Sequence, residues 1–410
     1  MVHVRKRALL LVAALAVFWA GSAGAQCPTG DVNLDCRVDY ADLLLLAQSW
    51  LLSAQTPADL NGDERVDGND LALLAKHWRQ RGCPIVINEI LAHSHAAAPD
   101  WIELHNVSSV PVDIGGWTLS DKKSELDKFT IDAGKRIAPF GYAIFYEHFH
   151  FGNVFNQGTR TPFALSENGE TLYLSAANDP LFGGCLMAET FGASETGNTF
   201  GRYLKSNGEY AFVTLSRATP LKANADPLVG PLVINEIMYH PTIDDDAEYI
   251  ELLNISLGLV TLFDSTAKEP WRFTDDAGID FWFPSDAPVR VRRNEHILLV
   301  RDAAAVGRLG VPASTQVFEW GPGRLSNRGE MIRLLKPGDV DEAQTRYWVE
   351  VDRIEYSDGS QAEEFPDGID PWPPEADGLG LSLNRVFPSR YGDDPNNWHA
   401  TIPTPGSTND

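Results

Sequence analysis

Two stretches of the chain carry the same twelve-residue pattern of oxygen-bearing side chains. The first reads Asp31-Val-Asn-Leu-Asp-Cys-Arg-Val-Asp-Tyr-Ala-Asp42, and the second, 28 residues later, reads Asp59-Leu-Asn-Gly-Asp-Glu-Arg-Val-Asp-Gly-Asn-Asp70. In both, acid or amide side chains stand at positions 1, 3, 5, 9 and 12, and a backbone carbonyl is available at position 7. Calcium takes about six to eight oxygen ligands from a tightly wound loop with this spacing. The pattern therefore predicts two calcium sites.

The spacing also predicts which residues bind the two ions. Side-chain ligands are expected from Asp31, Asn33, Asp35, Asp39 and Asp42 in the first loop and from Asp59, Asn61, Asp63, Asp67 and Asp70 in the second. Arg37 and Arg65 stand at position 7 and contribute only their backbone carbonyls, whereas the acids at position 9 bind through water. Two calcium ions neutralise clustered carboxylates that otherwise repel one another, so we expect calcium to fold this region.

An apolar segment follows each loop and is repeated as well. Asp42-Leu-Leu-Leu-Leu-Ala-Gln-Ser-Trp50 matches Asp70-Leu-Ala-Leu-Leu-Ala-Lys-His-Trp78. A duplicated calcium loop with one helix after each copy, and none before it, resembles the dockerin family over residues 27–83. The resemblance implies docking to a cohesin module on a scaffold protein. In that family, recognition concentrates at loop positions 10 and 11, which are Tyr40-Ala41 in one repeat and Gly68-Asn69 in the other. We therefore expect the two repeats to bind a cohesin unequally.

The N-terminus has the pattern of a secretory signal peptide. Lys6 and Arg7 precede an apolar segment from Ala8 to Ala20, and Ala23-Gly-Ala25 is a small-residue cleavage site. We expect residues 1–25 to be removed and the protein to be secreted, extracellular or at the cell surface. No other apolar segment approaches the roughly 20 residues that span a bilayer, so membrane insertion is not expected.

Composition limits the class of protein further. The chain has 410 residues, 43% of them hydrophobic and 22% charged, which is typical of globular material in two or three domains. Its formal charge of −24 argues against a nucleic acid or an anionic membrane as partner, because both require a basic surface.

The chain has four cysteines, and three of them lie in the dockerin-like region. An oxidising compartment favours one disulfide bond there. Cys27 and Cys83 bracket the region and would join its ends, while Cys36 competes for either partner. The sequence leaves this pairing open. Cys185 is interpreted as buried or solitary rather than reactive.

After Cys83 the hydrophobic pattern changes from helical to alternating, which is typical of β-strands. Landmarks from this region return in the same order further along the chain. Pro84-Ile-Val-Ile-Asn-Glu-Ile90 returns as Pro231-Leu-Val-Ile-Asn-Glu-Ile237, Asp100-Trp-Ile-Glu-Leu-His-Asn106 as Glu248-Tyr-Ile-Glu-Leu-Leu-Asn254, Trp117 to Asp121 as Trp271 to Asp275, Leu165 to Glu170 as Leu325 to Glu330, and Thr219-Pro as Thr404-Pro. A period this long indicates two whole domains, each expected to be an antiparallel sandwich.

The order of these landmarks resembles the lamin-tail domain, which implies an immunoglobulin-like fold. The predicted fold class is therefore mainly β with a small α module: a calcium-binding dockerin helix pair and two immunoglobulin-like antiparallel β-sandwiches. The expected divisions are a signal peptide at 1–25, a dockerin at 26–83, a first lamin-tail-like sandwich at 84–229 and a second at 230–410.

Three groups of residues invite a catalytic or metal interpretation. His93-Ser-His95 and His148-Phe-His150 have the spacing of zinc ligands on a strand, but no further ligand follows at a diagnostic spacing, so exposed loop histidines are expected. Glu89 with Glu103, and Glu236 with Glu251, resemble the carboxylate pairs of glycoside hydrolases. Because these pairs recur inside an internal repeat, we interpret them as structural.

Asp244-Asp-Asp246 is interpreted as a solvated turn rather than a third calcium site. Trp117 and Trp271 occupy equivalent positions in the repeat and are expected in the cores. No nucleophile elbow, phosphate-binding loop or dinucleotide fingerprint is present.

The sequence therefore favours a secreted, non-enzymatic modular adaptor. Its calcium-folded dockerin would bind the cohesin of a scaffold or cell-surface complex, and its sandwiches would present a binding surface, with a glycan or cell-surface ligand among the possible partners. The alternative is a dockerin-tagged hydrolase or carbohydrate-binding protein in polysaccharide breakdown.

Overall fold

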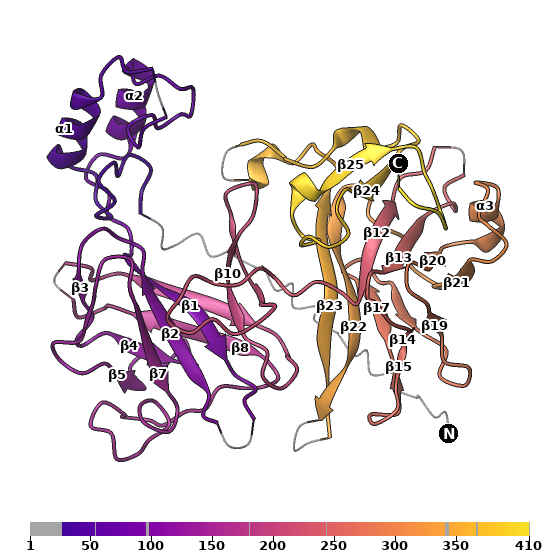
Figure 1. The fold of residues 1–410 in the computed structure, drawn as a ribbon, viewed down its shortest axis with the longest axis horizontal. Helices are drawn as coiled ribbons and strands as arrows, with labels where there is room; N and C mark the ends of the chain where they lie inside the picture. Colours follow the sequence, from indigo (N-terminus) through magenta and orange to yellow (C-terminus); the bar gives the residue numbers. More distant parts are fainter. Residues whose placement is uncertain are drawn as a thin grey trace, which may run out of the picture.

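The computed structural model describes residues 27–409 apart from 54, 96–97, 180, 243, 341–343 and 366–367. The proposed signal peptide lies outside the described residues. The fold is mainly β, with several antiparallel sheets and few helices, which confirms the predicted fold class. A small helical module lies at one end, next to a first β-sandwich, and a second sandwich follows (Figure 1).

The helical module contains α1 (Tyr40–Gln48) and α2 (Gly68–Lys76). Each helix begins at a loop aspartate, Asp39 or Asp67, whose carboxylate accepts a backbone N–H of the first turn. Asp42 and Asp70 complete a reciprocal capping box three residues later. The calcium-loop pattern therefore also provides the start signal of each helix.

The two halves of the module are related by an approximate twofold symmetry. The Val38 amide donates to Gln80 O at 3.0 Å, and the equivalent Val66 amide donates to Leu52 O at 3.1 Å. Each loop is thus joined to the segment that follows the other helix. The buried core is small and consists of Val32, Val38, Leu46, Ala58, Val66 and Leu74. A core of this size rarely holds a fold without metals or disulfides.

The first sandwich contains two main sheets and a short strand pair. The larger sheet has the order β11-β10-β1-β2-β7 and is formed by β1 (Ile85–Leu91), β2 (Trp101–Asn106), β7 (Tyr142–Tyr146), β10 (Phe200–Leu204) and β11 (Tyr210–Thr214). The other sheet has the order β5-β4-β8-β9 and is formed by β4 (Thr118–Ser120), β5 (Phe129–Thr130), β8 (Glu170–Ser175) and β9 (Leu186–Phe191). The short pair is β3 (Val112–Asp113) with β6 (Arg136–Ile137).

The second sandwich has the same plan with additions. Its larger sheet has the order β21-β20-β13-β12-β24-β25 and is formed by β12 (Leu232–Met238), β13 (Tyr249–Asn254), β20 (His296–Val300), β21 (Gln316–Glu319), β24 (Ser382–Arg385) and β25 (Trp398–Thr401). The other sheet has the order β18-β17-β22-β23 and is formed by β17 (Arg272–Asp275), β18 (Asp280–Trp282), β22 (Gly329–Val340) and β23 (Arg346–Ser357). Smaller elements are β14 (Val260–Thr261), β15 (Phe263–Asp264), β16 (Glu269–Pro270), β19 (Arg290–Val291), α3 (Ala303–Gly307) and the 3-10 turns η1 (Ala362–Glu364), η2 (Pro374–Ala376) and η3 (Pro395–Asn397).

The first strand pairs of the two sandwiches share a register and an irregularity. Ile85 lies opposite Asn106, and Leu232 lies opposite Asn254. In both pairs the register shifts within the repeated Ile-Asn-Glu, between Ile87 and Glu89 in β1 and at the matching place in β12. Trp117 and Trp271 are buried in the two cores, as the repeat predicted. The sequence repeat is therefore a repeat of topology.

Two disulfide bonds join the four cysteines, and the clasp between Cys27 and Cys83, one of the pairings that the sequence left open, is not among them. Cys27 is bonded to Cys36, and Cys83 is bonded to Cys185. A turn from Pro28 to Asp31 brings the chain start back onto the first loop, so Cys27 meets Cys36. Cys185 precedes β9 and meets the end of the helical module, and the interpretation that it is solitary was wrong.

The helical module contacts the first sandwich directly. The Ser109 amide donates to Leu34 O at 2.6 Å, and Ser109 Oγ donates to Asn33 O at 2.8 Å, so the sandwich supports the first loop. Arg37 lies over the ring of Phe182, with 5.7 Å from its guanidinium carbon to the ring centre. Cys83 is separated from β1 only by Pro84.

The two sandwiches also contact each other. Lys205 Nζ lies 3.8 Å from Asp393 Oδ2, and the rings of Tyr203 and Tyr391 meet edge to face at 5.5 Å. Figure 1 shows β10 of the first sandwich next to the C-terminal strands of the second.

Candidate functional site

The first loop is wound around its own oxygen atoms. Asp31 Oδ2 accepts the Cys36 amide at 2.7 Å, and Asn33 Oδ1 accepts the Asp35 amide at 2.9 Å. Asp42 closes the loop, because its Oδ1 accepts the Val32 amide at 2.8 Å and its Oδ2 accepts the Asp39 amide at 2.8 Å. All side-chain ligands expected from the sequence, except the helix-capping Asp39, thus accept hydrogen bonds from amides of the loop backbone.

The second loop has nearly the same network. Asp59 Oδ2 accepts the Glu64 amide at 2.8 Å, and Asn61 Oδ1 accepts the Asp63 amide at 3.1 Å. Asp70 Oδ1 accepts the Leu60 amide at 2.7 Å, and its Oδ2 accepts the Asp67 amide at 2.7 Å. Each hydrogen bond has its counterpart 28 residues earlier. The duplication therefore preserves the winding of the loop and not only its residue types.

Both loops fit a hard cation. Asp42 and Asp70 are fully buried, and Asp59 Oδ1 is buried without a hydrogen-bond partner among the described residues. Burial, opposed by backbone hydrogen bonds and reinforced by the charges of Asp42 and Asp35, raises the pKa of Asp31 to about 6. Carboxylates gathered out of water in this way are stabilised by a bound cation.

Both loops contain strained positions. Position 6 has a φ of 63° at Cys36 and of 66° at Glu64, in the left-handed region that favours glycine. Glycine is usual at this position of a calcium loop, and both loops keep the sharp turn despite a side chain there. Cys27, Asp31 and Cys36 have atoms within 4.8 Å of one another. The two sulfurs are bonded to each other, so they are not available as thiolate ligands.

The duplicated loops and part of the first sandwich lie in segments of the chain that match known family models. Residues 29–79 match the family model of the dockerin type I domain. Residues 79–182 match the family model of the lamin tail domain. No curated protein matches the chain. The helical module is thus a dockerin domain, and the matched part of the first sandwich is a lamin tail domain with an immunoglobulin-like fold.

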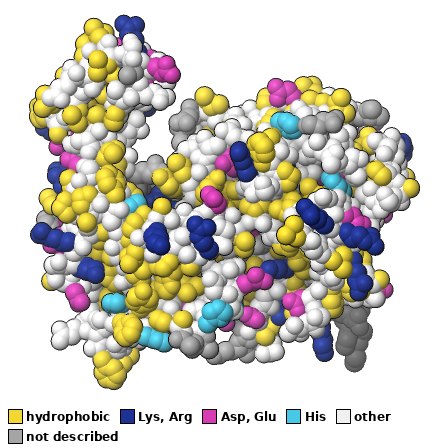
Figure 2. Space-filling model, viewed as in Figure 1, with side chains coloured by type: hydrophobic (Ala, Val, Ile, Leu, Met, Phe, Trp, Pro, Cys, Tyr) yellow, Lys and Arg dark blue, Asp and Glu magenta, His cyan; other side chains and the backbone are white. Residues whose placement is uncertain are grey.

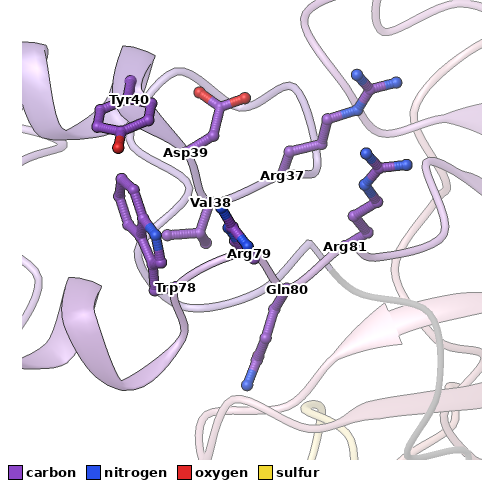
Figure 3. A pocket seen from close by; sticks show the side chains of 8 residues that line it. All are labelled: Arg37, Val38, Asp39, Tyr40, Trp78, Arg79, Gln80 and Arg81. Carbon is purple, nitrogen blue, oxygen red and sulfur yellow. The ribbon is translucent and has the colours of Figure 1, made fainter.

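The dockerin domain presents two symmetry-related faces that differ in chemistry. The first, which we call the arginine face, comprises Tyr40, Trp78, Arg79, Gln80 and Arg81. With Arg37, Val38 and Asp39 it lines a groove of about 500 Å³ (Figure 3). The ring of Tyr40 is 75% exposed and meets Trp78 edge to face at 5.2 Å. Arg81 donates to Leu181 O of the first sandwich at 3.4 Å, so this face borders the sandwich.

The second face, which we call the leucine face, occupies the equivalent positions 28 residues away. Here Trp50, Leu51 and Leu52 correspond to Trp78, Arg79 and Gln80 of the arginine face, and Gly68 corresponds to Tyr40. These three apolar side chains are 41%, 59% and 49% exposed. Figure 2 shows the dockerin projecting from the rest of the molecule with hydrophobic side chains on its surface. A group of exposed apolar side chains marks a surface for a protein partner.

The carboxylate pair of the first sandwich is buried and occupied by its own chain. Glu89 accepts the Thr219 amide at 2.9 Å and the Thr219 hydroxyl at 2.8 Å. Glu103 accepts the Leu221 amide at 2.5 Å and the Asn88 side chain at 2.8 Å. Burial raises the pKa of Glu103 to about 7. The pair clasps the segment that follows β11, in agreement with the structural role expected from the sequence.

The second sandwich repeats this clasp. Glu236 Oε1 accepts the Thr404 amide at 2.9 Å, and Glu251 Oε2 accepts the Gly406 amide at 2.7 Å. The Asn409 amide group donates to Asn235 O at 3.0 Å, as Asn224 donates to Asn88 O in the first sandwich at 3.1 Å. The Thr-Pro endings that the sequence marked as landmarks are therefore the partners of the buried Asn-Glu pairs.

The remaining candidates have mixed outcomes. His95 and His148 are exposed, as expected for loop histidines, but His93 and His150 are partly buried. The aspartates from 244 to 246 were expected to form a solvated turn. Asp245 and Asp246 do lie in a turn, and all three side chains are partly or fully exposed. Within it, Asp244 pairs with Arg308 at 2.7 Å, and Asp246 pairs with Arg324 at 2.6 Å.

The difference between the repeats at Tyr40 and Gly68 was predicted from the sequence, but the difference after the two helices and the contact with the first sandwich were not. Aligning the segments after the helices at the same 28-residue offset, Leu51-Leu52 against Arg79-Gln80, would have shown the difference between the faces. No such comparison within the sequence points to the contact between Ser109 and the first loop. No helix among the described residues has the length and hydrophobicity needed to cross a membrane.

Proposed function

We propose that this protein is a secreted modular adaptor whose dockerin binds calcium and docks onto a cohesin-bearing scaffold or cell-surface complex. The observation that carries the proposal is the duplicated loop network, together with Asp59 Oδ1, which is buried without a hydrogen-bond partner in the described part of the chain. Each loop would hold one calcium ion through the residues named above. The dockerin resembles modules that bind cohesins, which supports the choice of partner.

The second sandwich is proposed to be a second lamin tail domain. Its strand order, its register shift and its clasp repeat those of the first. The corresponding divisions are a signal peptide at 1–25, the dockerin at 26–83, and sandwiches at 84–229 and 230–410. In this arrangement the sandwiches form the part that is presented by the docked dockerin.

Calcium dependence is tested on the full chain by hydrogen exchange of the dockerin amides. Protection is expected in calcium and should be lost in excess chelator, and the double variant Asp31→Ala and Asp59→Ala should lose it in calcium as well. The exposed Glu64→Gln variant, outside the ligand set, serves as the control. Equal protection with and without chelator would refute the calcium proposal.

Docking is tested by measuring binding of the calcium-loaded chain to a panel of immobilised cohesin modules. The leucine face is the proposed anchor, because it is apolar and its Trp50, Leu51 and Leu52 side chains are exposed. Trp50→Ala should weaken binding by at least about 2 kcal/mol, since it truncates an aromatic anchor. Tyr40→Ala and Asn69→Ala should have smaller effects. A larger loss from Tyr40→Ala would move the anchor to the arginine face.

Carbohydrate binding is the second candidate function, and one observation favours it. Trp282 is 43% exposed in β18 and meets Trp348 of β23 edge to face at 5.0 Å, with Arg272 5.1 Å from the Trp282 ring centre. Exposed aromatic rings beside a guanidinium can stack on sugar rings and bind their hydroxyls. Retention of the chain on insoluble glycans, lost in Trp282→Ala, would support this function.

A further inference from the structure

We propose that Zn²⁺ binds where the two sandwiches meet, between His93 and Glu167 of the first and Asp339 of the second. Glu167 precedes β8, and Asp339 lies in β22. This proposal is independent of the calcium loops and of docking. It is also not the site that the His93-Ser-His95 spacing invited, because His95 is exposed and does not take part.

The imidazole of His93 is already oriented as a metal ligand. Its Nδ1 lies 2.8 Å from Ser194 O and donates its N–H to that carbonyl, which leaves the lone pair on Nε2. The His93 carbonyl in turn accepts the Gly197 amide at 2.7 Å, so the backbone is held as well. The side chain is only 12% exposed. A backbone carbonyl that fixes the tautomer is the usual outer partner of a zinc-binding histidine.

The distance from Nε2 to each carboxylate matches the spacing of two zinc ligands, whereas the two carboxylate oxygens lie farther from each other. Nε2 lies 3.5 Å from Glu167 Oε2 and 3.6 Å from Asp339 Oδ2. These separations are too long for hydrogen bonds, which span about 2.7–3.2 Å. Two ligands bound at about 2.0–2.1 Å to one tetrahedral zinc ion lie about 3.3–3.4 Å apart. Thr196 Oγ1 lies 3.0 Å from Nε2 and donates its hydroxyl to this lone pair, so a bound ion would displace this hydrogen bond and leave Thr196 free to contact a fourth ligand.

Within the described part of the chain, the negative charges of Glu167 and Asp339 beside His93 are not balanced by nearby cations. Two carboxylates face one imidazole, and neither has another ion-pair partner among the described residues. The nearby cation Lys336 is paired with Glu195 at 2.5 Å. A divalent ion would balance both carboxylates, whereas a proton on His93 would balance only one of them.

Binding requires the two carboxylates to rearrange. They approach Nε2 separately, and their oxygens must close toward each other to share one ion. The side chains of Glu167 and Asp339 are 49% and 65% exposed, so rotation about their own torsions is unhindered by the core. Because the two acids belong to different sandwiches, a bound ion would cross-link them.

The test is calorimetric titration of the full chain with Zn²⁺ in excess calcium, which keeps the dockerin loops occupied. One zinc site is expected, and His93→Ala, Glu167→Gln and Asp339→Asn should each weaken it roughly tenfold or more. His148→Ala, which removes an exposed histidine from the other His-x-His pair, should leave the affinity unchanged. Circular dichroism of each variant verifies its fold.

Three results would overturn the proposal. The first is the absence of zinc binding in the wild-type chain. The second is unchanged affinity in His93→Ala. The third is an effect of His93→Ala with none from Glu167→Gln and Asp339→Asn, which would indicate a surface histidine acting alone.

Discussion

At the scale of single residues, the dockerin loops combine ligand geometry with backbone strain. Glu64 stands at position 6 of the second loop with a φ of 66°. The left-handed conformation costs a non-glycine residue about 1–2 kcal/mol, whereas glycine adds about 0.5–1 kcal/mol of chain entropy to the unfolded state. The strain is therefore the larger of the two terms.

Glu64→Gly should accordingly stabilise the calcium-loaded dockerin by about 0.5–1 kcal/mol. Hydrogen exchange of the α2 amides in saturating calcium measures this change. Glu64→Ala keeps the strain and should give no gain. A loss of protection in Glu64→Gly would show that the Glu64 side chain stabilises the loop by a contact that outweighs its strain.

At the scale of elements, the two sandwiches are closed by their buried Asn-Glu clasps. Asn224→Ala removes a side-chain amide that forms hydrogen bonds at both of its polar atoms. Its Oδ1 accepts Asn88 Nδ2 at 2.8 Å, and its Nδ2 donates to Arg202 O at 2.9 Å. Buried groups left without partners cost about 1–3 kcal/mol, so the variant should lose about 2–3 kcal/mol of unfolding free energy. Chemical denaturation of the full chain measures it, with the exposed Lys222→Ala in the same segment as control. Equal small effects from both variants would show that the clasp is dispensable.

The elements also show what could be predicted from the sequence. The repeated Ile-Asn-Glu strands were found because their inward residues are apolar in both copies and their acids are invariant within the repeat. The disulfide pairing could not be found, because it depends on how the loop before β9 folds back onto Cys83. The additions to the second sandwich, such as β15, β16 and the parallel strand β21, lie in the longer loops, where no counterpart in the first copy constrained them.

At the scale of the whole molecule, buried acids link stability to pH. Burial raises the pKa of Glu103, Glu170, Glu189 and Glu330 to about 7, above the ordinary value of 4.5. A group with a raised folded-state pKa contributes stability that is complete below its unfolded value and is lost as the pH rises through its folded value. Asp113 and Asp246, whose pKa is lowered by backbone or side-chain hydrogen bonds, titrate below this range.

The melting temperature of the sandwiches should therefore rise as the pH falls from 8 to 6.5. Below that range His105 and His150 oppose the gain, because burial lowers their pKa from 6.5 and the unfolded chain then binds more protons. Thermal melts followed by the β-sheet signal in excess calcium test this. Glu103→Gln should flatten the dependence. A melting temperature that falls between pH 8 and 6.5 would contradict the sign.

The short connection between the dockerin and the first sandwich has a mechanical consequence. Pro84 is the single residue between the bonded Cys83 and the start of β1, and Ser109 holds the first loop from the other side. Most tethered domains explore a volume set by a flexible linker, and that volume determines their effective concentration for a second target. In this protein the connection is too short to let the sandwiches explore such a volume. Once docked, the sandwiches would stand at one distance and one angle from their scaffold, so the spacing of its docking sites would decide which neighbouring surfaces they touch.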